Sequence, residues 1–293
     1  MMEQLETLRR RLQSARDLHS VVKTMKTLAA VNIREYEQGV ESLKDYFRSI
    51  EMGLQILMRN RPEGIRLASP EKEEKLGVVV FGSEQGMVGQ FNEKIAEFAW
   101  KKLNEMKVEK KNRTVMVLGE KLIGRLDALG VEVEEGIHVF GSMVDINEVN
   151  QEVLLKVEEW RVEKKAGRII LFYNRPSSGT TYTQVMRKLL PLDEEWLNDL
   201  ESKKWPTHML PAFFMDWDKL FSALIQEYFF VTLYQASVES LASENASRLS
   251  SMQAAEKNIQ ERLDELSLKY QQQRQEAITA ELLDIVSGFE VLS

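Results

Sequence analysis

The 293-residue chain contains no cysteine, only six prolines and only 15 glycines. Without cysteine there can be no disulfide framework, thiolate metal site or cysteine nucleophile, and this composition is typical of an intracellular compartment. No uninterrupted apolar segment approaches the length of about 18 residues that a membrane span needs. The N-terminus lacks the apolar core of a secretion signal. We therefore expect neither a spanning helix nor a leader.

The chain also lacks an excess of positive charge. Its formal net charge of -7 argues against general nucleic-acid binding. The charge is uneven, because residues 1–35 hold seven Lys or Arg against four Asp or Glu. A basic helix end on an acidic protein favours an acidic protein surface as partner. A solvated helix face is the alternative for Arg9, Arg10, Arg11 and Arg16, and composition alone favours this alternative.

Residues 212–287 contain neither proline nor glycine, and we expect one helix over this stretch. At about 1.5 Å per residue it would be on the order of 110 Å long, more than the diameter of a globular chain of this size. We therefore expect it to project from any globular body. Apolar residues at three- and four-residue steps form its stripe: Leu220, Leu224, Tyr228, Val231, Tyr234, Val238, Leu241, Leu249, Met252, Ile259, Leu263, Leu266, Tyr270, Ile278, Leu282 and Ile285.

Residues 3–61 supply a helical partner for that stripe. They contain no proline, only Gly39 and Gly53 interrupt them, and their apolar residues from Leu8 to Leu57 fit a heptad. His19 and Lys26 are the two polar positions on this seam, and His19 is a candidate for setting the register. Pairing of the two terminal segments predicts a long antiparallel coiled coil, with the middle of the chain inserted as a separate body.

The middle of the chain has the pattern of a Rossmann-like α/β domain. Short apolar runs at 76–81, 113–118 and 168–173 predict strands, and the first and last have the continuous apolar character of buried parallel strands. Helical patterns follow at 91–103, 121–129 and 144–164, with a further extended segment at 131–140. We expect a turn-rich linker at 174–179, an edge hairpin with 180–190, and irregular chain from 191 to 211. The predicted division is 1–61 for the N-terminal coiled-coil helix, 62–211 for the α/β domain and 212–293 for the C-terminal coiled-coil helix.

The sequence offers little for catalysis. Gly82, Gly86 and Gly89 follow a strand and precede a helix, as a phosphate-binding loop would, but their spacing fits no nucleotide motif and no lysine accompanies them. A tight structural turn is the preferred interpretation. His19, His138 and His208 fall in unrelated segments without metal-ligand spacing, and Glu84 and Glu93 are expected to be solvated. We predict a non-catalytic chain with no cofactor and no metal.

Both ends of the chain carry residues that identify a family. Residues 239–249 (ESLASENASRL), followed by Met252, Ala254 and Asn258, are similar to the E-S-x-A-S-E-x-x-A-R stretch of the gamma subunit of F-type ATP synthases. Residues 266–288 resemble the family's ending, and residues 8–12 and 22–30 resemble its N-terminal segments. Residues 82–92 (GSEQGMVGQFN) depart from the family's T-S-D-R-G-L-C-G-G-L-N. Members are commonly basic and this chain is acidic, which suggests a divergent branch such as an alternative F-type ATPase.

The resemblance implies a central rotor shaft that couples ion flow through a membrane ring to conformational change in catalytic subunits. Its implied partners are the alpha and beta subunits of the catalytic head, and the epsilon subunit and c-subunit ring at the foot. It implies a peripheral position on the cytoplasmic face of the cell membrane, with proton or sodium left open as the coupling ion. Arg274, Gln275 and Thr279 occupy the family's positions for polar contact with catalytic subunits. Lys23, Met25 and Lys26 match the stretch that faces the catalytic subunits' acidic lever loops.

The end of the last helix is expected to lie in an apolar sleeve through Phe289, Val291 and Leu292. A cytoplasmic coiled-coil scaffold with an α/β domain is the structural alternative to the shaft. A nucleotide-using α/β domain with helical arms is the enzymatic alternative, and binding of labelled ATP by the isolated chain would distinguish it.

Overall fold

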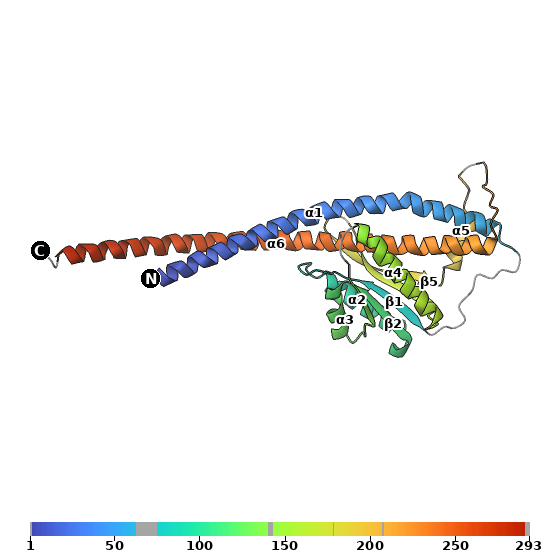
Figure 1. The fold of residues 1–293 in the computed structure, drawn as a ribbon, viewed down its shortest axis with the longest axis horizontal. Helices are drawn as coiled ribbons and strands as arrows, with labels where there is room; N and C mark the ends of the chain where they lie inside the picture. Colours follow the sequence, from blue (N-terminus) through green and yellow to red (C-terminus); the bar gives the residue numbers. More distant parts are fainter. Residues whose placement is uncertain (1, 63–74, 140–142, 178, 207, 291–293) are drawn as a thin grey trace. The chain divides into compact units, whose positions relative to one another are not determined.

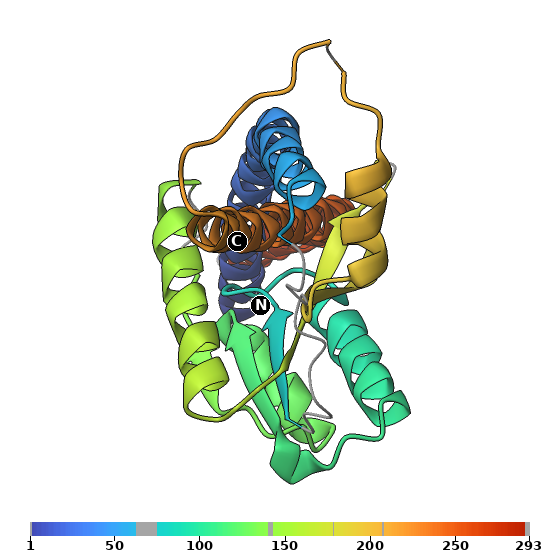
Figure 2. The same cartoon turned by 90° about the vertical axis from the view of Figure 1, so that its right-hand side faces the viewer.

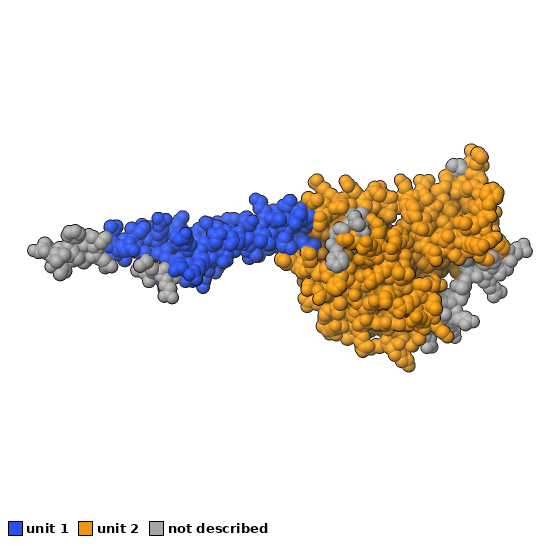
Figure 3. Space-filling model, viewed as in Figure 1, with its two compact units in different colours: residues 1–30, 248–293 blue, residues 31–247 orange. Residues whose placement is uncertain are grey.

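The computed structural model describes residues 2–62, 75–139, 143–177, 179–206 and 208–290. The chain divides into two compact units (Figure 3). Unit 1 comprises Met1–Ala30 and Arg248–Ser293, and unit 2 comprises Val31–Ser247. Two long helices, α1 (Met2–Arg59) and α6 (Trp217–Glu290), contribute to both units. Across the described ranges, no helix has the length and apolar character needed to cross a membrane.

Unit 1 is an antiparallel pair formed by the first half of α1 and the last part of α6 (Figure 1). Lys26 of α1 lies beside Glu256 of α6, while Leu8 shares a groove with Lys269. The predicted α1 seam is confirmed in this unit, because Leu12, Val22 and Ala29 are buried. On α6 the matching buried residues are Met252 and Leu266.

Unit 2 is built on a five-stranded sheet of order β3-β2-β1-β4-β5. Strands β1 (Leu76–Phe81), β2 (Arg113–Leu118), β3 (Glu135–Ile137) and β4 (Arg168–Pro176) pair in parallel. Strand β5 (Tyr182–Leu190) pairs antiparallel with β4 at the edge. The predicted Rossmann-like sheet and edge hairpin are therefore confirmed, and the first two strands have the expected bounds.

Helices cover both faces of this sheet (Figure 2). Helices α2 (Phe91–Glu105) and α3 (Glu120–Ala128) pack on one face through Ile95, Leu103 and Leu122. Helix α4 (Met143–Val162) and α6 pack on the other, where Trp160 and Leu233 join the core beneath β1 and β4. Each central strand is consequently buried on both sides, as its continuous apolar sequence indicates.

The expected irregular segment at 191–211 contains a helix, α5 (Glu194–Ser202), so this prediction was wrong. Asp193 caps the helix by accepting a hydrogen bond from the Glu195 N–H at 3.0 Å, and Leu197 and Leu200 are buried against α1 and α6. Arg59 of α1 donates to the Glu201 and Lys203 carbonyls at the other end. Helix α6 correspondingly begins at Trp217, five residues later than predicted.

The turn-rich linker predicted at 174–179 is partly strand, because β4 continues to Pro176. Asn174 pairs with Gln184 in the β4–β5 ladder and accepts a hydrogen bond from the Gln184 amide at 3.0 Å. The extended segment predicted at 131–140 is shorter than expected, with only three residues in β3. Pro176 is accommodated because it is the last residue of β4, beyond Phe172, where the pairing of β4 with β1 ends.

Candidate functional site

The Gly82–Asn92 turn is a self-contained structural element. The Ser83 N–H donates to Asn92 Oδ1 at 3.0 Å, and the Asn92 amide donates back to Ser83 Oγ at 2.8 Å. A Cβ on Gly82 would lie 2.4 Å from Leu122 Cβ, so the glycine permits close packing of the turn on α3. The preferred interpretation as a tight structural turn agrees with this geometry.

Glu84 occupies the position where an anion would meet a helix N-terminus. Its carboxylate accepts the backbone N–H of Glu120, the first residue of α3, and that of Val139, each at 3.3 Å, and it contacts His138 Nδ1 at 2.8 Å. Partial burial raises the pKa of Glu84, but these hydrogen bonds outweigh burial and leave the pKa lowered. The expectation of a solvated Glu84 was wrong, and its negative charge disfavours phosphate at this place.

Glu84 and Glu93, which were expected to be solvated, each have a separate charged or titratable partner. Glu93 forms an ion pair with Arg125 at 2.7 Å. The Glu84 hydrogen bond and charge raise the pKa of His138. His19 lies half-buried in unit 1, and His208 is exposed. The described part of the chain holds no group of three or more His, Asp or Glu that could bind a metal ion.

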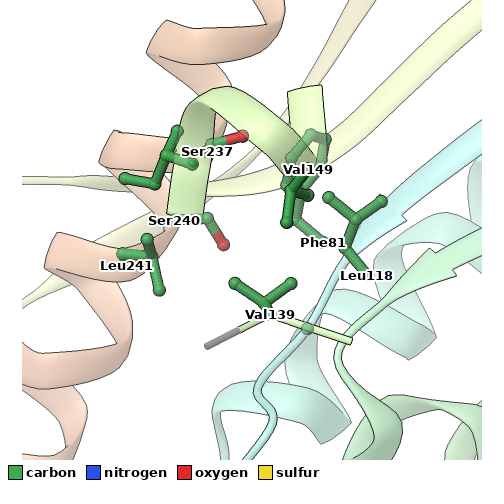
Figure 4. Close-up of a pocket in the computed structure, with 9 residues that line it drawn as sticks. Phe81, Leu118, Val139, Val149, Ser237, Ser240 and Leu241 are labelled. Atoms are coloured by element: carbon green, nitrogen blue, oxygen red, sulfur yellow. The ribbon is translucent and has the colours of Figure 1, made fainter. Parts of the chain in front are cut away.

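A small cavity lies beside the carboxyl end of β1 (Figure 4). Its walls include Phe81 and Leu118 from the sheet, Val149 from α4, and Ser240 and Leu241 from α6. At about 10 Å³ it holds at most one water molecule. The buried Ser240 hydroxyl has no protein partner, so it is the polar group that such a water would meet. A space of this size excludes a nucleotide or other organic ligand.

In unit 2 the family-like stretch of α6 is buried on every side. From Ala236 to Ser247 each residue is buried between α1, α4, β4 and the turn after β1. Small side chains make this close packing possible. They are Ala236, Ser237, Ser240, Ala242, Ser243, Ala246 and Ser247.

Two surfaces of α1 in the unit 1 pair differ in chemistry. Arg9, Arg16 and Lys23 are exposed at seven-residue intervals, so they lie along one line of α1. Leu18 and Leu28, 53% and 56% exposed, belong with Val21 and half-buried Met25 to an apolar stripe on another side. Sequence analysis missed this stripe, although its steps of three, four and three residues were visible beside the seam.

The residues predicted to contact catalytic subunits fall into two groups. Arg274, Gln275 and Thr279 are exposed on α6, and Thr279 Oγ1 donates to the Gln275 carbonyl at 2.9 Å. Lys23 is exposed and Met25 is half-buried on α1. Lys26 instead bridges the two helices, because its Nζ lies 2.5 Å from Glu256 Oε2. The Lys26 hydrogen bond lowers the pKa of Glu256, with His19 and Lys23 adding to the effect.

The predicted stripe of α6 does not continue to its end. Ile278 and Leu282 are 47% and 58% exposed, while the positions facing α1 before them are Leu266, Tyr270 and Gln273. Gln4 and Thr7 of α1 line a groove with Gln273 and Glu276 of α6, so the described groove between the helices reaches only as far as Glu276 on α6. The side chain of Phe289, and Val291 and Leu292 altogether, lie outside the described residues.

Comparisons with known proteins agree with this architecture. A family model described as ATP synthase matches residues 4–292. The ATP synthase gamma chain of Nautilia profundicola is 26% identical over 300 residues, covering 99% of both chains. The rotor of Euglena gracilis mitochondrial ATP synthase, in rotational state 1, is similar in fold with a TM-score of 0.64 at 18% identity, covering 95% of this chain and 100% of that chain.

The OSCP/F1/c-ring structure of the same Euglena enzyme, in rotational state 3, contains a chain with a TM-score of 0.63 at 20% identity. That match covers 100% of this chain and 95% of the other. Both likenesses include the terminal helices as well as the sheet. Because the family match runs over residues 4–292, the chain belongs to the ATP synthase family, and the curated relative compared with it is a gamma chain along nearly its whole length.

Proposed function

We propose that this chain is the central rotor shaft, the gamma subunit, of an F-type ATP synthase and performs no chemistry itself. The observation that carries the proposal is the antiparallel pair of α1 and α6 in a chain whose family match spans residues 4–292. A coiled-coil scaffold unrelated to any motor is disfavoured, because that full-length match includes both helices and the sheet. The proposed partners are the alpha and beta subunits of the catalytic head.

The mechanism follows from the unlike faces of the unit 1 pair. A two-helix rod has no three-fold symmetry, so a ring of three catalytic subunits meets three different surfaces at any instant. The basic line of Arg9, Arg16 and Lys23 favours one conformation of an acidic neighbour, whereas the apolar stripe of Leu18 and Leu28 favours another. Such differential contact shifts otherwise equal sites to different conformations, and rotation exchanges those conformations.

Within the pair, Arg274, Gln275 and Thr279 are proposed as polar contacts with catalytic subunits. Lys23 and Met25 are proposed to face acidic loops of the same subunits, with steering by charge complementarity. Lys26 differs from Lys23 and Met25, because its ion pair with Glu256 holds it between the two helices. The exposed Ile278 and Leu282 supply an apolar surface for the sleeve in which we expect the shaft to end.

The remaining parts of the proposal concern the foot. Residues 62–211 are proposed as the foot domain, between helical segments 1–61 and 212–293, with the epsilon subunit and the c-subunit ring as its partners. Ion coupling and membrane attachment then arise only through the complex, on the cytoplasmic face of the membrane. The divergent-branch assignment is proposed from the altered Gly82–Asn92 turn and the net charge of -7.

Affinity purification from the native membrane tests the proposal, and we expect one copy of this chain per three-fold catalytic head.

We expect Arg274→Ala with Gln275→Ala to weaken coupling or assembly while the isolated chain stays folded, because both side chains are exposed. Lys257→Ala, an exposed residue earlier on α6, is the matched control. Unchanged ATP hydrolysis and ion pumping by the reconstituted double variant would count against these contacts.

A further inference from the structure

Helix α6 in unit 2 is held by directed polar contacts on the side that faces the sheet. Phe229 and Leu233 pack in the core beneath the sheet, whereas Val238 and Leu241 further along join the cluster with Tyr36 of α1. Toward β4 and the turn after β1 the helix presents Ser243 and Ser247 instead. Small side chains form low ridges, so they give little steric resistance to a helix that turns or slides about its own axis.

The polar contacts come from several elements around the helix. Ser237 Oγ donates to Asn150 Oδ1 of α4 at 2.9 Å, and Ser243 Oγ donates to the Asn174 carbonyl of β4 at 3.1 Å. Ser247 Oγ donates to the Val88 carbonyl of the turn at 2.6 Å. Ser243 and Ser247 lie one turn apart on one side of α6 and Ser237 lies on another, so a rotation of the helix displaces all three hydroxyls from their acceptors.

The most polar part of this arrangement is a chain of four side chains. Arg175 Nε of β4 donates to Glu239 Oε2 at 2.8 Å, and Gln235 Nε2 donates to Glu239 Oε1 at 2.7 Å. Arg187 of β5 donates to Gln235 Oε1 at 2.9 Å. The Glu239 side chain is 7% exposed, so both of its oxygens are satisfied within the protein.

The Arg175 guanidinium is itself fixed by its own strand. It donates to the Tyr173 hydroxyl at 2.7 Å and lies 5.7 Å from the centre of the Tyr173 ring. These contacts with Tyr173 therefore fix the orientation of the guanidinium group that donates to Glu239. At a side-chain radius of about 6 Å, a helix rotation of roughly 20° moves an atom by about 2 Å, which exceeds the tolerance of a hydrogen bond.

We propose that the Arg175–Glu239–Gln235–Arg187 network locks α6 against the β4–β5 hairpin, so that torque on the helix reaches the α/β body. These four are positioning residues, and the inference rests on the proposed rotor function. Without the network, the small-residue contacts over residues 236–247 give this part of α6 less resistance to turning within the body. The motor would then hydrolyse ATP while moving fewer ions per ATP.

The test combines Arg175→Met with Glu239→Gln, which removes both charges and keeps similar side-chain volume. In the reconstituted complex we expect ATP hydrolysis to continue while the ratio of ions pumped to ATP hydrolysed falls several-fold. Arg125→Met is the matched control, because it breaks the exposed Arg125–Glu93 pair within the same body. Arg187→Met is a milder second variant should the double variant fold poorly, and a smaller fall in the same ratio is expected from it.

A second measurement on the isolated full chain separates this inference from the rotor proposal. The absence of native cysteine allows spin labels at Lys188→Cys on β5 and Ala223→Cys on α6, both exposed. The double variant should broaden the distance distribution between them, and the Arg125→Met control should not. An unchanged distribution overturns the lock, as does a broadened one with normal pumping. Failure of the wild-type chain to assemble with catalytic subunits would instead refute the rotor function.

Discussion

At the residue scale, close backbone approach explains which glycines the body needs. Gly119 joins β2 to α3 with a φ of +94°, and a Cβ there would lie 2.7 Å from the Ser83 carbonyl carbon. Gly124 lies within α3, and a Cβ there would meet nothing within 4 Å. The two glycines, five residues apart, therefore have opposite tolerances for a methyl group.

Gly119→Ala should lower the free energy of unfolding of the isolated chain by about 3 kcal/mol, because it adds both a clash and backbone strain. Gly124→Ala should raise it by up to about 1 kcal/mol, because alanine favours a helix interior. Urea unfolding followed by circular dichroism measures both. Equal effects of the two substitutions would contradict the account of this turn.

His138 and Glu84 give the turn a dependence on pH. The raised pKa of His138 means that its pairing stabilises the fold below the ordinary value of 6.5 and is lost as pH rises through the raised value. The lowered pKa of Glu84 means that its interactions stabilise the fold above 4.5 and are lost as pH falls through the lowered value. Between pH 4.5 and pH 6.5, the ordinary pKa values of Glu84 and His138, the interactions of both groups stabilise the fold.

His138→Gln should therefore lower the melting temperature more near pH 5.5 than near pH 8.5, since the imidazolium is lost on the alkaline side. His208→Gln, at an exposed site in the loop before α6, is the control and should show no such difference. Melting curves of the isolated chain at the two pH values suffice. A deficit of the same size at both would show that charge is not involved.

At the element scale, sequence periodicity located most of the fold. The bounds of β1 and β2 were predicted correctly, because each is a continuous apolar run with a charged residue, Lys75 or Arg113, at its start and a glycine, Gly82 or Gly119, after its end. Helix α5 was not predicted, although Asp193, Glu194 and Glu195 form an N-terminal capping signal. The prolines at 191 and 206, which flank this segment, favoured irregular chain instead. The predicted β4 was too short, because Asn174 and Arg175 are polar and do not fit an apolar strand pattern. Their side chains contact Gln184 and α6, and no local sequence pattern reveals those contacts.

The candidate site was predicted in part. The seam of α1 and the Lys26 position follow from heptad spacing, but the Glu256 partner depends on the register between two helices that are far apart in sequence. Exposure of Ile278 and Leu282 depends on the register between α1 and α6, which spacing within α6 does not specify. The Arg175–Glu239 pair likewise joins a strand and a helix separated by tertiary packing alone.

Adjacent valines test the apolar stripe of α1. Val21 is 54% exposed on the stripe, whereas Val22 is 4% exposed in the seam. Val22→Ser should lower the free energy of unfolding by roughly 2 kcal/mol, while Val21→Ser should change it by less than about 0.5 kcal/mol. Val21→Ser should nevertheless weaken assembly with the catalytic subunits, measured by reconstitution at limiting concentration. Wild-type assembly by Val21→Ser would remove the stripe from the proposed contact surface.

At the scale of the whole molecule, two kinds of helix environment serve one proposed task. In unit 1 the pair of α1 and α6 keeps chemically different faces exposed, as contact with several neighbours requires. In unit 2 residues 236–247 of α6 are buried on every side and held by polar contacts, as transmission of torque to a body requires. The family resemblance at 239–249 falls largely in this closely packed segment, where small side chains leave little room for larger ones.

Rotation under ATP is the most direct test of the central claim. In a complex fixed by its catalytic head, a probe attached to Lys101→Cys on α2 reports the motion of the body, and the cysteine-free chain makes this attachment specific. We predict that ATP drives stepwise rotation of the probe in one direction, and that a cross-link between the chain and a catalytic subunit stops it. A stationary probe on a head that continues to hydrolyse ATP would contradict the shaft function.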